Sequence, residues 1–130
     1  LPFEVDPVSL ESLGTYKFCP DMPLGFGAHF KVDSKDGVLY NMGLCAPPGI
    51  GLDLMAIAPD GQVLRRGRVG LPGQFMAFVH DFCMSENYIA IIICPWKMPA
   101  GNMLPAMSGT MPLGHSFEWD DTSGTRCVIV

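Results

Sequence analysis

The chain has 130 residues, of which 48% are hydrophobic and 16% are charged, and its formal net charge at pH 7 is −5. This length suits one domain with a moderate core, and this composition is typical of a globular, loop-rich protein rather than a disordered one. The excess of acidic over basic residues argues against a surface that binds nucleic acid. The one basic cluster, Arg65, Arg66 and Arg68, is typical of the solvated face of a strand.

The cysteines are scattered along the chain and form no C-x-x-C pair: Cys19, Cys45, Cys83, Cys94 and Cys127. An odd number of cysteines in or beside apolar stretches predicts reduced, buried thiols and favours a cytoplasmic location. The longest apolar run, 89–94, has the length of a strand and is too short to span a bilayer. No targeting segment is recognisable, so a peripheral membrane location and a plastid are alternatives to the cytoplasm.

In chain order, the pattern predicts an all-β protein with almost no helix. One helix is predicted over 6–14, where Asp6 can act as the N-cap, Pro7 suits the first helical position and Gly14 can end the helix. Strands are predicted at 15–19, 27–33, 37–43, 52–58, 62–69, 78–84, 87–94, 115–119 and 125–130. Their regular spacing favours a sandwich, a barrel or a propeller over any α/β architecture.

Turn residues separate these strands at 33–37, 59–61, 85–87 and 120–124, and each turn is expected to join two neighbouring strands. Two segments depart from this pattern. The first, 45–51, is a rigid Pro/Gly connector. The second, 95–114, is predicted to be a long loop, with Met98, Met103, Met107 and Met111 along it. Such a loop can form an adaptable apolar contact surface or can pack over a neighbouring sheet.

His29 and His80 each stand at or near the start of a predicted strand, far apart in the sequence, so a site that they share would depend on the tertiary structure. On the pattern alone a hydrogen-bonded structural role is more common, and two ligands are too few for a tight transition-metal site. His115 could form a triad with Ser108 and Asp120, but no nucleophile motif supports one. A structural or exposed role is expected for His115.

Two segments resemble the iron-ligand segments of the carotenoid cleavage oxygenases. AHFKVDSKDGVLYNMG, which contains His29, is similar to the first of them, where a strand reads approximately A-H-P-K-x-D before a turn. VHDFCMSENYIAIIICP, which contains His80, resembles the second, approximately H-D-F-x-x-T-E-N-Y before an apolar strand. DPVSLESLG, PDGQVLRRGRVGLP and FEWDDTSGTRCVIV also resemble family segments in the same order, so the resemblance covers essentially the whole chain. Phe30 stands where the family commonly has Pro, and Ser85 where it has Thr.

The resemblance implies that residues 1–130 are a partial carotenoid-oxygenase-like domain, truncated at both ends: about two blades of a seven-bladed β-propeller. Such a propeller holds Fe(II) on its axis through four histidines. His29 and His80 take the places of the first two, whereas His115 matches none. The other two histidines, and at least one glutamate that supports them, are expected outside this chain. No catalytic residue is expected beyond the metal ligands.

The implied parent protein is a non-haem Fe(II) dioxygenase. It would use O2 to cleave a C=C double bond of a carotenoid, an apocarotenoid or a stilbene into two carbonyl products. Its partners would then be a small lipophilic alkene and O2, and the 95–114 segment could border the substrate entrance or touch a membrane.

Two alternatives come from other classes of protein. The parent could be a metal-free propeller that serves as a binding or scaffold module, in which case one or both of the other two ligand histidines would be absent from the full-length protein. The 130-residue chain could also be inactive on its own, because two blades would leave strand edges and apolar faces uncovered.

Overall fold

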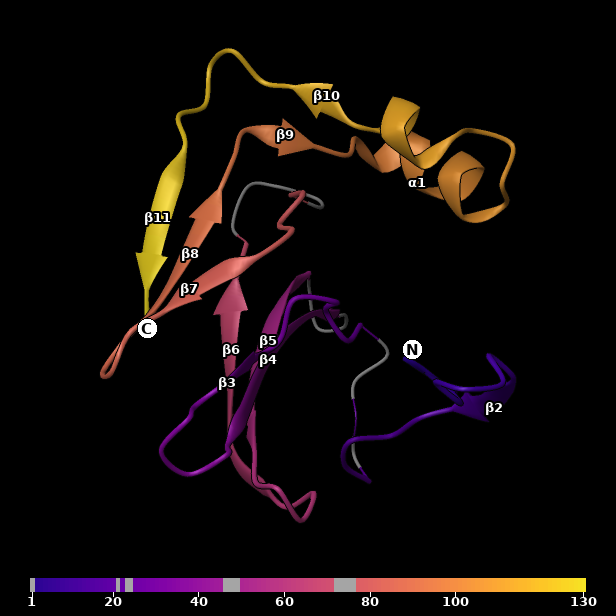
Figure 1. Ribbon diagram of the computed structural model, residues 1–130. Coiled ribbons are helices and arrows are strands. Elements are labelled where there is room, and N and C mark those ends of the chain that lie inside the picture. The colour runs from indigo at the N-terminus through magenta and orange to yellow at the C-terminus, as the bar shows by residue number, and fades with distance from the viewer. Residues whose placement is uncertain (1, 21, 23–24, 46–49, 72–76) are drawn as a thin grey trace. The chain divides into compact units, whose positions relative to one another are not determined.

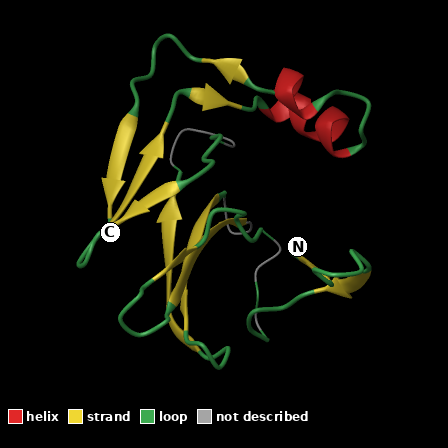
Figure 2. Ribbon diagram, viewed as in Figure 1, coloured by secondary structure: helices red, strands yellow, loops and turns green. Residues whose placement is uncertain are grey.

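The computed structural model describes residues 2–20, 22, 25–45, 50–71 and 77–130 (Figure 1). The described part of the chain is mostly short strands, with one α-helix and one 3₁₀ helix (Figure 2). The chain divides into two compact units, Leu1–Val69 and Gly70–Val130.

The first unit contains a two-stranded and a four-stranded sheet. Its strands are β1 (Phe3–Val5), β2 (Ser12–Thr15), β3 (Lys31–Val32), β4 (Leu39–Cys45), β5 (Gly51–Ile57) and β6 (Val63–Gly70). β1 pairs with β2, and the larger sheet has the order β3-β4-β5-β6. The antiparallel register of β4 and β5 runs from Leu39 opposite Ile57 to Cys45 opposite Gly51. Of the predicted connector 45–51, residues 46–49 lie outside the described residues.

The turns predicted at 33–37 and 59–61 do join neighbouring strands of this sheet. In the first turn, the Gly37 amide donates to the Asp33 carbonyl at 2.8 Å. In the second, the Gly61 amide donates to the Ala58 carbonyl at 2.9 Å. Both glycines have positive φ, 73° and 87°, a conformation that other residues rarely adopt. The glycines of the two turns therefore help to set the register of β3 against β4 and of β5 against β6.

The core of the first unit lies against β5, all seven residues of which are buried. Met55 and Ile57 form its centre with the buried thiol of Cys19. The aromatic ring of Phe18 covers this cluster and stacks on Phe26 with 4.8 Å between the ring centroids. The segment that precedes β3 is thereby fixed to one face of the sheet.

The helix predicted over 6–14 is wrong. The Asp6 carboxylate does accept the amide hydrogens of Val8 and Ser9, both at 2.8 Å, as an N-cap would. The helix does not continue, because Leu10 adopts a left-handed conformation with φ 62° and the chain returns as β2 to pair with β1. The strand predicted over 15–19 is correspondingly displaced to 12–15.

The second unit contains a three-stranded and a two-stranded sheet. Its strands are β7 (Phe82–Met84), β8 (Ile89–Ile93), β9 (Trp96–Lys97), β10 (Glu118–Trp119) and β11 (Arg126–Ile129). The larger sheet has the order β11-β8-β7, and β9 pairs with β10. Ile91, at the centre of β8, is 0% exposed. The turn predicted at 85–87 closes the β7–β8 hairpin, where the Ser85 amide donates to the Tyr88 carbonyl at 2.9 Å.

The turn predicted at 120–124 connects two strands that do not pair with each other. Residues 115–119 contribute β10, which pairs with β9. Residues 125–130 contribute β11, which pairs with β8. The pattern predicted the two segments but not their partners, since pairing between strands far apart in sequence leaves no local signal.

The prediction of a long loop over 95–114 is also wrong. This segment contains β9, the helix α1 (Ala100–Met107) and the start of a 3₁₀ helix (Leu113–Ser116). The side-chain amide of Asn102 donates to the Ser116 carbonyl at 3.1 Å and joins the two helices. Pro105 lies inside α1, and such a proline is normally a sign that no helix forms. Among the described residues, no helix combines the length and the hydropathy needed to cross a membrane.

Asp120 anchors the turn between β10 and β11. Its carboxylate accepts the Lys97 ammonium group at 2.7 Å, the Ser123 hydroxyl at 2.6 Å and the Thr122 hydroxyl at 2.6 Å. The Lys97 bond, followed by the hydroxyl bonds, holds the pKa of Asp120 far below its ordinary value.

Acidification is expected to weaken the second unit through Asp120. A carboxyl whose folded pKa lies below the unfolded value of about 3.9 stabilises the fold fully above that pH and loses this effect as the pH falls toward the folded pKa. Asp120→Asn should therefore lower Tm at pH 7, and its deficit should shrink toward pH 3. Thermal unfolding from pH 7 to pH 3 measures this, with the exposed Asp121→Asn as control. A deficit that stays constant with pH would show that the charge of Asp120 is unimportant.

Candidate histidine sites

His29 lies where the pairing between the β3 segment and β4 is interrupted. Lys31 of β3 pairs with Tyr40 of β4. Four residues earlier in the chain, the Gly27 amide donates to the Met42 carbonyl at 3.0 Å, only two residues further along β4. The segment that contains His29 is therefore two residues longer than the stretch of β4 opposite it. This is a bulge, a feature that redirects side chains and is common beside active sites, and His29 is exposed on it.

The buried side chain of Asn41 holds one end of this bulge. Asn41 is 3% exposed. Its Oδ1 accepts the Gly27 amide at 3.0 Å, and its Nδ2 donates to the Gly27 carbonyl at 2.8 Å. Both ends of the buried amide are thus hydrogen-bonded, as burial requires. The backbone is fixed two residues before His29.

Three glycines allow the segment to approach β4 this closely. A Cβ atom on Gly43 would overlap the carbonyl oxygen of Gly25. A Cβ on Gly27 would overlap the Met42 carbonyl oxygen, and one on Gly25 would lie 2.7 Å from the Leu44 amide nitrogen. Glycine is required where two backbones meet in this way. The GFG sequence before His29 therefore serves packing against β4.

His80 also lies at an interruption of a ladder. Ala77 forms an isolated bridge with Lys97, whereas β7 begins at Phe82, opposite Ile91. The register of the bridge and that of β7 differ by one residue, with the extra residue between Ile91 and Lys97, and residues 78–81 lie outside any strand. The strand predicted from residue 78 accordingly starts later, and His80 precedes it as an exposed residue.

An aromatic cluster supports the His80 ring. The imidazole stacks on Phe78 with 5.8 Å between ring centroids and 13° between ring planes. Phe78 in turn contacts Trp96 at 4.9 Å and Phe117 at 5.5 Å, and its amide donates to the Trp96 carbonyl at 3.0 Å. One face of the imidazole therefore rests on an apolar surface, which restricts its orientation.

Asp81 follows His80 and organises the start of β7. Its Oδ1 accepts the amide hydrogen of Phe82 at 2.7 Å, and Phe82 is buried. Asp81 thereby fixes the start of the strand, and regular pairing begins two residues after His80.

Ser108 and Asp120, two residues of the candidate triad, have other hydrogen-bond partners. Ser108 Oγ donates to the Pro105 carbonyl at 3.1 Å and lies 3.0 Å from the Thr110 hydroxyl, and Asp120 binds Lys97. His115 is exposed on the 3₁₀ helix, as expected for a residue outside any site.

The donor atoms that could bind a metal are spread over both units. His29 belongs to the first unit and His80 to the second. Among the described residues, no group of three or more His, Cys, Asp or Glu side chains could hold a metal ion. The two imidazoles are of the type that binds ferrous iron, and a complete shell would need further ligands.

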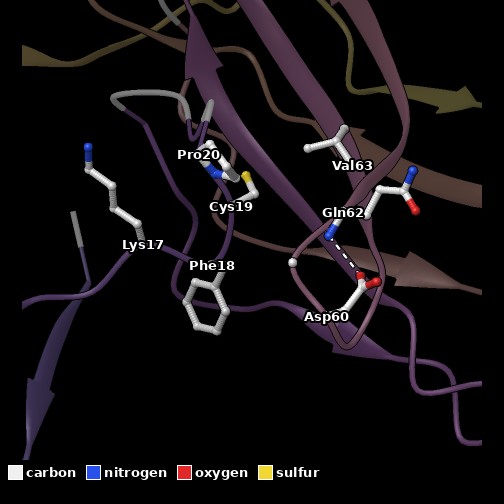
Figure 3. Close-up of a pocket in the computed structure, with 8 residues that line it drawn as sticks. Lys17, Phe18, Cys19, Pro20, Asp60, Gln62 and Val63 are labelled. Atoms are coloured by element: carbon white, nitrogen blue, oxygen red, sulfur yellow. Dashed lines mark hydrogen bonds between the residues drawn. The ribbon is translucent and has the colours of Figure 1, made fainter.

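The first unit also contains an open hollow of about 720 Å³ (Figure 3). It is lined by residues 17–20 and by the turn after β5: Lys17, Phe18, Cys19, Pro20, Asp60, Gly61, Gln62 and Val63. The Asp60 carboxylate accepts the Gln62 amide at 2.9 Å, so this acid shapes the turn. None of the three histidines lines the hollow.

Asp53 forms a further polar group on the sheet of the first unit. It accepts a hydrogen bond from the Arg66 guanidinium at 2.7 Å. Burial acts to raise the pKa of Asp53, but the bonds from Arg66 and Cys45 outweigh it, and the pKa lies below its ordinary value. Burial also raises the pKa of the Cys45 thiol. Arg65, Arg66 and Arg68 lie exposed on β6, as expected for the solvated face of a strand, and Arg66 also neutralises the buried carboxylate of Asp53.

The cysteines differ in their burial. Cys19 is buried, Cys45 and Cys94 are partly buried, and Cys83 and Cys127 are exposed. The expectation that the cysteines are buried is thus wrong for Cys83 and Cys127.

The sequence singled out His29 and His80 as candidate ligands but did not indicate the residues that support them. Asn41 could have been recognised from the sequence, because it is a polar residue at an inward position of an otherwise apolar strand. The aromatic support of His80 was not detectable, since Trp96 and Phe117 are brought to Phe78 by pairings distant in sequence.

Comparisons with known proteins agree on one family. The sequence profile of the RPE65 family, described as retinal pigment epithelial membrane protein, matches residues 1–130. Resveratrol cleavage oxygenase 1 of Chaetomium globosum is 31% identical over 92% of this chain and 20% of its own length. Carotenoid cleavage oxygenase 1 of Neurospora crassa is 31% identical over 92% of this chain and 22% of its own length. Isoeugenol monooxygenase of Pseudomonas putida is 29% identical over 96% of this chain and 25% of its own length.

Solved structures show the same fold. A cobalt-substituted Synechocystis ACO superimposes with a TM-score of 0.76 at 21% identity, over 99% of this chain and 28% of that one. An ACO/RPE65 chimera superimposes equally well at 22% identity. These structures are β-propellers, so the expected all-β propeller fold is confirmed. The chain spans between a fifth and a quarter of the length of the resveratrol, carotenoid and isoeugenol oxygenases named above. It belongs to the RPE65/carotenoid cleavage oxygenase family.

Proposed function

We propose that residues 1–130 are part of a larger propeller domain, and that the whole protein is a non-haem Fe(II) dioxygenase. It would cleave a C=C double bond of a carotenoid, apocarotenoid or stilbene with O2 and yield two carbonyl products. The observation that carries the proposal is that both histidines matching the family's ligand segments are exposed at interruptions of antiparallel ladders.

The residues present fit ferrous iron as two ligands of a larger set. Neutral imidazole nitrogens suit this metal, and His29 and His80 would hold it with further ligands from outside the chain. When bound, iron supplies the redox-active centre that reacts with O2. The role of this chain's other residues is to orient the two rings: Asn41 and the glycines fix the backbone before His29, and Phe78 supports the His80 ring.

The names of the relatives favour a small lipophilic alkene as the substrate of this protein. The relatives are named for resveratrol, carotenoid and isoeugenol. Resveratrol appears in the names of three relatives, each from a fungus, so we propose a phenolic stilbene as the first substrate to test and a carotenoid as the second.

The experiment is oxygen-isotope labelling of products from the full-length, iron-loaded protein. Resveratrol and a carotenoid would each be supplied with ¹⁸O₂, and the products analysed by mass spectrometry. A dioxygenase places one labelled oxygen in each of two carbonyl products. Label in only one product would assign a monooxygenase instead. Full iron loading without cleavage of either substrate would favour the binding or scaffold alternative.

The helix α1 offers a surface for a lipid membrane or a lipophilic substrate. No residue of α1 is buried, and Leu104 and Met107 are 75% and 79% exposed. From residue 98 to residue 117 the sequence contains no Asp, Glu, Lys or Arg. An uncharged helix with exposed apolar side chains is suited to the interface of a bilayer. We propose that the protein is cytoplasmic and contacts membranes through α1.

Leu104→Asp is expected to weaken vesicle binding by the full-length protein about tenfold, because a buried leucine contributes 1.5–3 kcal/mol and the new carboxylate opposes insertion. Co-sedimentation with neutral phosphatidylcholine vesicles measures this. The matched control is Val8→Asp, since Val8 is an exposed apolar residue on the turn after β1. Equal effects of the two substitutions, or no vesicle binding by the unmodified protein, would refute a specific membrane contact by α1.

A further inference from the structure

The aromatic cluster beside His80 brings together two distant parts of the second unit. Phe78 lies two residues before His80, and its ring is nearly parallel to the imidazole, with 13° between the ring planes. Trp96 belongs to β9, and Phe117 immediately precedes β10. Residues 78–81 lie outside any strand, so no regular ladder sets the direction of the His80 side chain. The packing of Phe78 therefore takes a larger part in setting it.

Trp96 and Phe117 hold the Phe78 ring in place. Phe117 meets this ring nearly at a right angle, 85°, with 5.5 Å between the ring centroids. Trp96 contacts both other rings, with centroid distances of 4.9 Å to Phe78 and 5.2 Å to Phe117. Edge-to-face and tilted pairs at such distances are favourable. Phe117 is only 9% exposed, so a smaller side chain there would leave a space into which Phe78 could move. The imidazole that stacks on Phe78 would move with it.

The position of Phe117 is in turn fixed from α1. The side-chain amide of Asn102 donates to the carbonyl of Ser116, the residue before Phe117, at 3.1 Å. Ser116 is 0% exposed, and its hydroxyl donates to the Leu113 carbonyl at 2.6 Å. The residue after Phe117, Glu118, begins β10, which pairs with β9 beside α1 (Figure 1). Phe117 is thus held by α1 on one side in the sequence and by β9 on the other.

We propose that Phe117 is a positioning residue for the His80 ring, and that Asn102 holds Phe117 in place from α1. The path runs from Asn102 through the Ser116 carbonyl to Phe117, and from there through the Phe78 ring to the imidazole. This rests on the proposed function, in which His80 binds iron. The new element is that the grip of His80 on the metal depends on the attachment of α1 to the rest of the second unit.

The test uses cobalt(II) as the probe in the full-length protein, since cobalt replaces the metal in Synechocystis ACO. Titration gives the cobalt affinity, and the visible absorption bands of the bound ion report the arrangement of its ligands. Phe117→Leu keeps an apolar side chain but removes the ring. It is expected to weaken cobalt binding about tenfold, the lower end of the effect of residues that orient a metal ligand, and to alter the bands. Asn102→Leu should change both in the same direction and by less.

The matched control is Tyr88→Leu, which removes a 61% exposed ring from the same unit. It should leave the cobalt affinity and the bands unchanged. Circular dichroism shows whether each variant is folded. A purely structural role of Phe117 would lower the Tm of Phe117→Leu but would leave the affinity and the bands of the folded protein as they were.

The possible failures are distinguishable. Unchanged affinity and bands in folded Phe117→Leu, together with loss of cobalt in His80→Ala, would overturn the positioning role and leave the proposed metal site standing. Normal cobalt binding by His80→Ala, or none by the unmodified protein, would overturn both. If Phe117→Leu does not fold, Asn102→Leu decides, and unchanged affinity and bands in that variant contradict the proposal.

A crystal structure of the metal-free, full-length Phe117→Leu protein gives a second readout that needs neither metal nor turnover. The His80 imidazole is expected to leave its position parallel to Phe78, or to occupy two orientations. An imidazole that keeps its single orientation would contradict the proposal.

Discussion

Replacing His80 by alanine in the full-length protein is expected to remove iron and alkene cleavage together. Even residues that only orient a metal ligand contribute 10–100-fold to metal affinity, so loss of a ligand should weaken Fe(II) binding by more than about 100-fold. His29→Ala should have the same effect. The measurements are metal content after anaerobic loading and gel filtration, and the initial rate of cleavage.

The matched control is His115→Ala, which removes an exposed imidazole from the same unit as His80. It should leave iron content and turnover unchanged. Circular dichroism of all three variants shows whether the fold is intact. Normal iron content in folded His80→Ala would contradict the assignment of this residue as a ligand.

Gly43→Ala is expected to be the most damaging small substitution in the first unit. The added Cβ would occupy the position of the Gly25 carbonyl oxygen, and a backbone cannot yield as a flexible side chain does. We expect a loss of about 3 kcal/mol in the free energy of unfolding, at the upper end of typical overpacking costs. Displacement of the segment 25–27 from β4 should also reduce iron affinity, since this segment leads to His29.

Gly67→Ala is the control for Gly43→Ala. Gly67 also lies in a strand, β6, but a Cβ there would meet nothing within 4 Å. Its effect should be small, within about 1 kcal/mol and of either sign. Urea unfolding of the two variants measures the difference. Equal stability of the variants would show that Gly25 and Gly43 do not meet as described.

The sequence predicted the strands whose turns and register are local. The hairpins at 33–37, 59–61 and 85–87 depend on nearby glycine, aspartate and serine residues, and all three formed. The prediction failed where a distant partner decided the outcome. Residues 6–14 have a good helix signal, but pairing with β1 makes the return strand β2 more favourable than a second helical turn.

The candidate site was predictable only in part for the same reason. The motifs around His29 and His80 mark the two residues, yet a motif does not reveal an interruption of a ladder. The bulge before β3 arises from a difference between two registers, and its support comes from Asn41 on the next strand. The 95–114 segment was predicted to be a loop, whereas it contains α1, which a hydrogen bond from Asn102 to the Ser116 carbonyl joins to the following 3₁₀ helix.

The most direct test of the account is the position of iron in a crystal of the full-length protein. Anomalous diffraction at the iron absorption edge would locate the metal without any substitution. The account predicts a single peak with one nitrogen of His29 and one of His80 at about 2.1 Å, the usual length of a bond from a divalent metal to imidazole. An iron peak remote from either histidine, or no peak after loading, would contradict the claim that these two residues bind the metal.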